Sequence, residues 1–142
     1  MLRSLKNTFK IISVLSFILL GTVFITPNVA LAGGFVDTCW DRRIEQPGRV
    51  YLTATCENRN GDRVSARLDL SERIANYNGN LSWANPQGNF QDSCRSIEVW
   101  NQPLATFEML QADCADGNGG FNDSRLNLNE RISNQNGVLA YD

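Results

Sequence analysis

The sequence predicts an all-β protein with short helical turns, made of two tandem copies of one disulfide-linked unit. Three observations predict this fold class. A stretch of sequence is duplicated, apolar and polar residues alternate with a period of two in several runs, and four cysteines occur in a chain that begins with an export-type leader. After that leader no long helical pattern is present. We therefore expect a small, exported, β-rich protein.

The segment 1–32 has the features of a secretory signal peptide. Basic residues within the first ten positions adjoin a largely apolar stretch, Phe9–Ile25, and the small-residue tripeptide Ala30-Leu31-Ala32 follows. The alternative is an uncleaved membrane anchor, because the length of this apolar stretch is near the shortest that spans a bilayer. Pro27 breaks a helix just before the Ala-x-Ala site and favours cleavage after Ala32. The predicted mature chain is 33–142, secreted into a periplasm or the medium without membrane association.

The composition of the mature chain argues against several partners and chemistries. It has ten arginines, no lysine and 15 acidic residues, a formal charge of −5. Such a surface disfavours nucleic acid and anionic membranes as partners. No histidine is available as a general base near neutral pH, and oxidised cysteines supply no thiolate. We therefore predict that the protein is not an enzyme. Paired carboxylates for glycoside hydrolysis remain an alternative to the simpler interpretation, solvated acidic side chains.

The sequence predicts no metal and no other cofactor. Without histidine or a Cys-x-x-Cys pair, a zinc site lacks its usual ligands. The segment Asp113–Gly120 is similar to part of a calcium loop. Counted from Asp116, however, the sixth position is Phe121 instead of glycine and the twelfth is Asn127 instead of glutamate. A glycine-rich hairpin turn is the better interpretation.

A tandem duplication organises the mature chain. Leu68–Trp83 returns as Leu126–Tyr141 with nine of 16 positions identical, and Phe35–Cys39 returns as Phe90–Cys94. The spacing of these two matches differs slightly, because the segment between the cysteines is longer in the second copy. We expect one domain with a first repeat over 35–83, a linker over 84–89 and a second repeat over 90–141.

Within each copy the local signals are those of strands and tight turns. Arg49–Cys56 and Val64–Leu70 alternate between apolar or small residues and polar ones. Asn-Gly pairs at 60–61, 78–79 and 136–137 are typical of type I′ hairpins, in which both central residues need positive φ. Ser71 and Asn129 are expected to cap short helical turns that begin at the glutamate following each of them.

The four cysteines predict two disulfides, because export compartments are oxidising. A turn centred near Pro47-Gly48 places Cys39 opposite Cys56, within the Cα separation that a disulfide tolerates. A tip near Pro103–Ala105 does the same for Cys94 and Cys114. Four cysteines allow three connectivities, so pairing within each repeat is favoured and the other two stay open.

The mature chain holds 14 asparagines, many of them in the predicted turns. Short planar amides offer paired donors and acceptors to sugar hydroxyls and lose little rotamer entropy on binding. Ordinary turn chemistry is the alternative, because asparagine also tolerates the left-handed backbone conformation. Composition alone therefore permits sugar binding without establishing it.

Several motifs resemble those of the cyanovirin-N family, and two of them occur in both copies. They are Phe-x-x-[Thr/Ser]-Cys, the segment Cys56-Glu-Asn-Arg-Asn-Gly, the pattern Leu-[Asp/Asn]-Leu-x-x-x-Ile-x-Asn-x-Asn-Gly-x-Leu-x-[Trp/Tyr], and the linker Trp83–Phe90. The resemblance extends from Phe35 to Tyr141. It implies a cyanovirin-N fold of two pseudo-symmetric repeats that exchange strands, with disulfides inside each repeat and no cofactor. It also implies a secreted lectin for α-linked mannose on high-mannose glycans.

The family's first sugar pocket draws on the chain before the first cysteine, after the second cysteine and at the last Asn-Gly turn. Thr38, Glu57 and Asn134 match the family's prototype, whereas Gly34, Arg59 and Asn136 differ from it. The positions carried over by resemblance are Gly34, Asp37, Thr38, Glu57, Asn58, Arg59, Asn134, Gln135 and Asn136.

The second pocket lies at the opposite end of the family's fold. Asn76 and Asn89 match the prototype and Ser93 keeps a hydroxyl, but the loop after Cys114 lacks the prototype's basic and glutamine side chains. This pocket is therefore expected to be the weaker one. Its positions are Asn76, Tyr77, Asn78, Asn89, Gln91, Asp92, Ser93, Asp116 and Asn118.

The expected partners are glycans or glycoproteins, bound by a monomer or by a domain-swapped homodimer with its hinge in the linker at Pro86. An alternative function keeps the fold without the sugar. In that case the protein would be a secreted interaction module whose long hairpin, Ile97–Met109, contacts a partner through Trp100 and Phe107.

Overall fold

The structure, a computed structural model, describes residues 33–85, 87–100 and 107–142. The predicted signal peptide over 1–32, the proposed hinge at Pro86 and the predicted hairpin tip at Pro103–Ala105 lie outside the described residues. Within those residues, no helix has both the length and the apolar character needed to cross a membrane.

The same order of elements occurs twice along the chain. The first set is η1 (Phe35–Asp37), β1 (Cys39–Glu45), β2 (Tyr51–Glu57), β3 (Arg63–Asp69), η2 (Leu70–Glu72), β4 (Ile74–Tyr77) and β5 (Asn80–Trp83). The second set is η3 (Phe90–Asp92), β6 (Cys94–Trp100), β7 (Met109–Ala115), β8 (Phe121–Asn127), η4 (Leu128–Glu130), β9 (Ile132–Gln135) and β10 (Val138–Tyr141). Each set forms one antiparallel three-stranded sheet and one two-stranded hairpin. The predicted all-β class with short 3-10 turns is confirmed.

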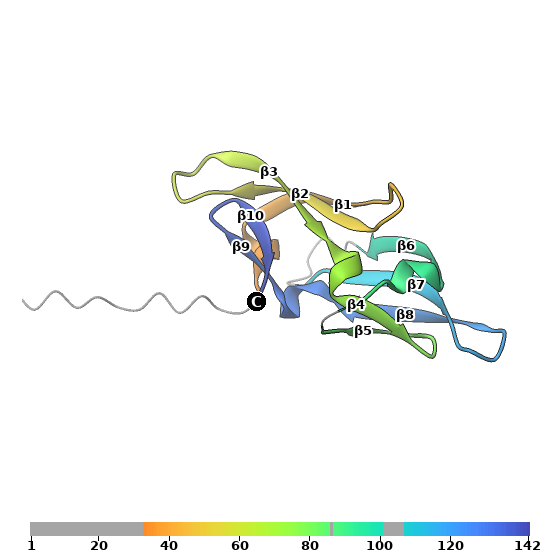
Figure 1. The fold of residues 1–142 in the computed structure, drawn as a ribbon. Coiled ribbons are helices and arrows are strands. Elements are labelled where there is room, and N and C mark those ends of the chain that lie inside the picture. The colour runs from red at the N-terminus through yellow and green to blue at the C-terminus, as the bar shows by residue number, and fades with distance from the viewer. Residues whose placement is uncertain (1–32, 86, 101–106) are drawn as a thin grey trace, which may run out of the picture.

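Each two-stranded hairpin packs against the three-stranded sheet of the other repeat. The β9-β10 hairpin lies beside β3, and the β4-β5 hairpin lies beside β8 (Figure 1). The Leu81 amide donates to Ser124 Oγ at 2.8 Å, and the Tyr141 hydroxyl donates to the Asp69 carbonyl at 2.6 Å. Trp83 meets Tyr141, its equivalent in the second repeat, edge to face with ring centroids 6.2 Å apart. The expected strand exchange is therefore present.

The Asn-Gly turns of the two short hairpins have the predicted conformation. Each leaves a two-residue loop, and Asn78, Gly79, Asn136 and Gly137 have φ of 51°, 85°, 59° and 89°. At 60–61 the structure differs from the prediction. The loop between β2 and β3 is longer, and of that pair only Gly61 has positive φ, at 82°. A longer loop is built around a different type of turn.

The 3-10 turns begin earlier than predicted, and other residues cap them. Asp69 accepts from the Ser71 amide at 2.9 Å, and Asn127 accepts from the Asn129 amide at 3.0 Å. The prediction that Ser71 and Asn129 are the caps was wrong. A cap residue has extended backbone, as Asp69 has with φ −80° and ψ 103°, whereas Ser71 lies inside η2. The Ser71 hydroxyl instead accepts from the Val50 amide at 2.9 Å.

The cysteines pair within each repeat, one of the three connectivities that the sequence allows. Cys39 is bonded to Cys56 and Cys94 to Cys114, and both pairs are in register across their hairpins. Just beyond each first cysteine the register shifts by a β-bulge. The bulges contain Asp41 and Ser96, whose φ values of 52° and 54° are unusual for residues other than glycine.

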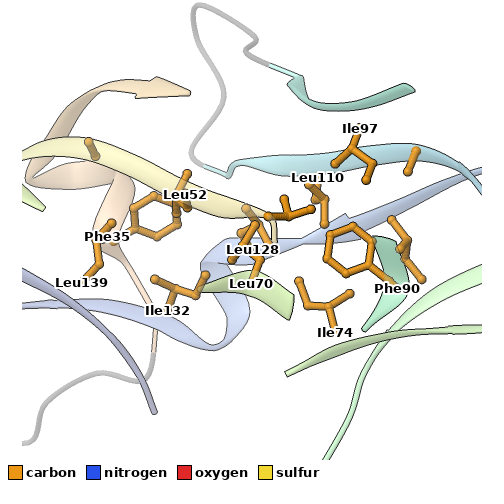
Figure 2. Packing of buried hydrophobic residues seen from close by; sticks show 14 of the residues in the cluster. Phe35, Leu52, Leu70, Ile74, Phe90, Ile97, Leu110, Leu128, Ile132 and Leu139 are labelled. Atoms are coloured by element: carbon orange, nitrogen blue, oxygen red, sulfur yellow. The ribbon is translucent and has the colours of Figure 1, made fainter. Parts of the chain in front are cut away.

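One hydrophobic core joins the two repeats (Figure 2). Phe35 and Phe90 occupy equivalent positions of the two repeats, and both are 0% exposed. Leu70 and Leu128, from η2 and η4, lie between them in the centre of the cluster (Figure 2). Burial of one such apolar side chain stabilises the fold by about 1.5–3 kcal/mol. Because both repeats contribute to one core, the loops at both ends of the molecule have fixed positions.

Candidate functional site

Asn134 on β9 joins three elements at one end of the molecule. Its Nδ2 donates to Thr38 Oγ1 at 2.9 Å and to the Glu57 carbonyl at 2.8 Å, and its Oδ1 accepts from the Gly137 amide at 2.7 Å. An amide side chain has two N–H donors, and both have partners here. Asn134 therefore fixes the positions of the residue before Cys39, the end of β2 and the β9-β10 turn relative to one another.

The loop after β2 is held by a second asparagine. Asn58 Oδ1 accepts from the Asn60 and Asp62 amides, each at 2.9 Å. On the opposite side, the Arg59 amide donates to Asn136 Oδ1 at 2.9 Å. Arg59 belongs to the first repeat and Asn136 to the second, so this contact closes the site across the repeat boundary. The loop is thus ordered before any ligand binds.

A cavity of about 600 Å³ opens between these segments. Seven of the nine residues carried over for the first pocket line it: Thr38, Glu57, Asn58, Arg59, Asn134, Gln135 and Asn136. Gly34 and Asp37 do not line it. They lie before and within η1, where Gly34 has φ 85° and donates from its amide to the Asn129 carbonyl at 3.3 Å.

The groups that remain for a ligand differ from those that build the cavity. Glu57, Arg59 and Gln135 are exposed and present a carboxylate, a guanidinium and an amide. A carboxylate accepts hydrogen bonds, a guanidinium donates up to five, and an amide does both. This combination suits a neutral ligand with many hydroxyl groups, since each hydroxyl both donates and accepts.

At the other end of the molecule, Asn76 makes the same three bonds as Asn134. Its Nδ2 donates to Ser93 Oγ at 3.0 Å and to the Ala115 carbonyl at 2.9 Å, and its Oδ1 accepts from the Gly79 amide at 2.7 Å. In the following loop, Asp116 Oδ1 accepts from the Asn118 and Gly120 amides at 2.8 and 2.9 Å. These backbone bonds, the one from Asn118 first, lower the pKa of Asp116.

The second cluster lacks the charged side chains of the first. Ala115 stands at the position of Glu57, and Gly117 at the position of Arg59. Tyr77, next to Asn78 in the turn, is 56% exposed and adds an aromatic surface instead. The framework is therefore repeated while the ligand-facing groups are not.

The remaining residues carried over for the second pocket lie along η3 and just before it. Gln91 Nε2 donates to Asp92 Oδ1 at 3.2 Å, while Gln91 Oε1 is buried without a hydrogen-bond partner among the described residues. Asn89 lines a different cavity, of about 420 Å³. Its other lining residues are Arg49, Ser71, Glu72, Arg73, Gln87 and Gly88. The sequence analysis missed this cavity, because its residues come from separate segments with no shared local pattern.

Among the described residues, no group of three or more cysteine, aspartate or glutamate side chains is arranged to hold a metal ion. The chemistry that the two clusters offer is hydrogen bonding by amides, hydroxyls and charged groups.

Comparisons with known proteins agree with this geometry. A cyanovirin-N homolog of Neurospora crassa is 31% identical over 102 residues, which cover 70% of this chain and 90% of that protein. The solution structure of a designed cyanovirin-N homolog lectin is 33% identical with a TM-score of 0.67, covering 77% of this chain and 99% of that one. A microvirin–mannobiose complex is 25% identical with a TM-score of 0.64, covering 78% and 99%. The family model of the CVNH domain matches residues 35–140, and the chain belongs to this cyanovirin-N homology family.

Proposed function

We propose that this chain is a secreted, non-enzymatic lectin that binds α-linked mannose of high-mannose glycans in the cavity around Asn134. One observation carries the proposal. Seven polar residues from both repeats line one cavity, and hydrogen bonds between them hold its shape. Membership of the CVNH family and the likeness to microvirin, whose complex contains mannobiose, support mannose as the sugar.

Recognition in this proposal depends on hydrogen bonds to a rigid frame. Glu57 accepts from sugar hydroxyls, Arg59 and Gln135 donate to them, and the loop held by Asn58 needs no reordering on binding. Hydrogen bonds to charged groups contribute about 1.5–3 kcal/mol each, more than neutral ones. The preorganised loop lowers the entropic cost of association.

The cluster around Asn76 is proposed as a second, weaker sugar site. Its frame repeats that of the first site, but Ala115 and Gly117 supply no charged partner for a hydroxyl. Two unequal sites on one rigid body, or four in a domain-swapped homodimer, would increase avidity for branched glycans through effective concentration. Glycoproteins that carry such glycans are the expected partners.

Placing residues of the second site into the first tests the proposal. The variant Glu57→Ala/Arg59→Gly gives the first site the residues that the second has at these two positions, Ala115 and Gly117. We expect it to bind an α-linked mannobiose at least about tenfold more weakly, because two charge-assisted hydrogen bonds are lost. The measurement is an NMR titration that follows the backbone amides of both clusters.

The matched control is Tyr77→Ala, which alters the exposed turn of the second cluster alone. It should leave the shifts around Asn134 unchanged. Binding that is unaffected by the double substitution, or shifts confined to residues outside both clusters, would contradict the proposal.

A second candidate function is the interaction module without sugar binding. Trp100, at the end of β6, is 37% exposed, and Phe107, just before β7, is 40% exposed. However, the Arg125 guanidinium covers one face of Trp100 at 4.9 Å from the ring centroid. Because this ring already has a partner inside the protein, we favour the lectin. Deletion of residues 101–107 should leave mannobiose binding intact.

A further inference from the structure

Gly33, the first residue that the structure describes, is hydrogen-bonded to the side chain of Asp142. Gly33 is buried, and its backbone nitrogen donates to Asp142 Oδ2. Two other bonds hold Asp142, one to its side chain and one from its backbone. Ser133 Oγ donates to Oδ1 at 2.7 Å, and the Asp142 amide donates to the Arg131 carbonyl at 3.2 Å. Its oxygen Oδ2 is therefore aimed at the Gly33 nitrogen.

The position of Gly33 admits no side chain. Its φ is 82°, and a Cβ atom would lie 1.8 Å from the Asn129 carbonyl oxygen, far inside any allowed contact. The next residue continues this anchoring, since the Gly34 amide donates to that same carbonyl at 3.3 Å. Cleavage after Ala32 would thus make the first residue of the mature chain the one that the fold requires to be glycine.

We propose that leader cleavage between Ala32 and Gly33 creates an ion pair between the new α-ammonium group of Gly33 and the carboxylate of Asp142. An endopeptidase hydrolyses the Ala32–Gly33 peptide bond. The hydroxyl of water goes to the Ala32 carbonyl carbon and its remaining proton to the glycine nitrogen, which leaves as an amine. Near neutral pH the new carboxyl group releases its proton to solvent and the amine takes one up from solvent. A single uncharged N–H donor becomes a cation with three N–H donors.

The pair gains strength from its charge and from the orientation of the carboxylate. Hydrogen bonds between ionised groups are roughly twice as strong as neutral ones. The carboxylate is already oriented by Ser133, so little side-chain freedom is lost when the pair forms. Arg131 and Arg73 line a cavity together with Asp142, and their positive charge partly offsets the attraction. Processing would therefore stabilise the contact between the N-terminal segment and the end of the β9-β10 hairpin.

This inference rests on the secretion that we propose for the chain and is independent of its sugar site. Expression of the full chain in a host that exports it gives the first test, by the intact mass of the released protein. We expect the mass of a chain that begins at Gly33 and has both disulfides. A mature chain beginning at any other residue would overturn the proposal, whereas sugar binding could still be present.

The second test uses the absence of lysine after Ala32. The α-amino group of the processed chain is then its only amine, so mild acetylation converts it alone to a neutral amide. We expect acetylation to lower the melting temperature by on the order of 4 °C. In the variant Asp142→Asn, acetylation should change the melting temperature far less, because the carboxylate is gone.

The four proteins form a double-substitution cycle that isolates the pair. Equal melting temperatures of the free and acetylated chains with Asp142 present would overturn the ion pair. An equal loss on acetylation in the Asp142→Asn variant would also overturn it, since acetylation would then act without the carboxylate. Circular dichroism spectra with the same β-sheet signal and a single cooperative unfolding transition serve as a check that all four proteins are folded.

Discussion

Two side chains at equivalent positions organise the loops that follow β2 and β7, one of them a neutral amide and the other a carboxylate. Asn58 and Asp116 each accept two backbone N–H bonds through one side-chain oxygen. The neutral amide and the carboxylate therefore make the same pair of backbone bonds, although the two loops differ in that Gly117 has φ 76° and Arg59, at the equivalent position, does not have a positive φ. Only the carboxylate makes the stability of its loop depend on pH.

The variant Asp116→Asn should keep the loop and remove that dependence. The pKa of Asp116 is lowered in the folded protein, so its contribution to stability is present above its unfolded pKa, about 3.9, and is lost as pH falls through the folded value. We expect wild type to lose melting temperature relative to Asp116→Asn as pH falls below about 4. Thermal unfolding of both proteins at a series of acidic pH values measures this. Parallel curves would contradict the assignment.

The pKa of Glu108 is shifted in the opposite direction to that of Asp116. Glu108 is 1% exposed, and burial raises its pKa although the Arg42 guanidinium, 2.7 Å away, acts to lower it. A raised pKa means that the folded state holds the proton more tightly than the unfolded state. Stability from this group is therefore complete below the unfolded pKa, about 4.3, and declines as pH rises through the folded value.

We expect the free energy of unfolding of wild type, relative to Glu108→Gln, to fall as pH rises from about 4 toward neutrality. Denaturant titrations of the two proteins at several pH values give this difference. The outcome that contradicts the prediction is a difference that grows with pH, as it would if the attraction of Arg42 outweighed the cost of burial.

Among the strands, arginines stacked on aromatic rings connect β1 to β3 and β6 to β8. In the first repeat the Arg63 guanidinium lies 4.4 Å from the ring centroid of Trp40, and in the second Arg95 lies 3.8 Å from that of Phe121. The arginine and the aromatic residue occupy opposite strands in the two repeats. Trp40 on β1 is equivalent to Arg95 on β6, and Arg63 on β3 is equivalent to Phe121 on β8. The sheet therefore accepts the pair in either direction.

A transplant of the second pair into the first repeat tests this equivalence. Trp40→Arg alone should destabilise the protein by roughly 0.5–1 kcal/mol or more, because it loses a cation–π contact and places two arginines together. Adding Arg63→Phe should recover most of that loss. Chemical denaturation of the single and double variants measures the recovery. Additive losses would show that the two residues do not interact.

Local sequence predicts those elements whose conformation is decided locally. Asn78-Gly79 and Asn136-Gly137 were predicted as tight turns because both residues of each pair tolerate positive φ. The bulges at Asp41 and Ser96 were not predicted, since neither is glycine and the surrounding sheet imposes their conformation. The cavity lined by Asn89 is formed jointly by residues 87–89 and by η2, which are separate segments of the chain, and no local pattern encodes that contact. For the site around Asn134, the residues came from the family resemblance and not from periodicity or composition.

For the whole molecule, the two disulfides are expected to supply a large part of the net stability. They close loops with sequence separations of 17 and 20, for which the chain-entropy model gives roughly 3 kcal/mol each. The total free energy of unfolding of a small domain is about 5–15 kcal/mol. We therefore expect reduction of the two disulfides either to unfold the chain or to lower strongly the guanidinium chloride concentration at the midpoint of unfolding. Unfolding curves with and without a reductant measure the effect, and equal midpoints would contradict it.

The exchanged hairpins give the cavity around Asn134 walls from opposite ends of the chain, with Thr38 and Glu57 on one side and Gln135 and Asn136 on the other. A saccharide bound there, as we propose, would connect segments that the chain itself joins only through the whole fold, and would act as a reversible cross-link. By mass action, a free saccharide concentration of about one hundred times the dissociation constant would add roughly 2.7 kcal/mol to the free energy of unfolding. A half-length fragment would have no such benefit, because each repeat alone carries only one wall.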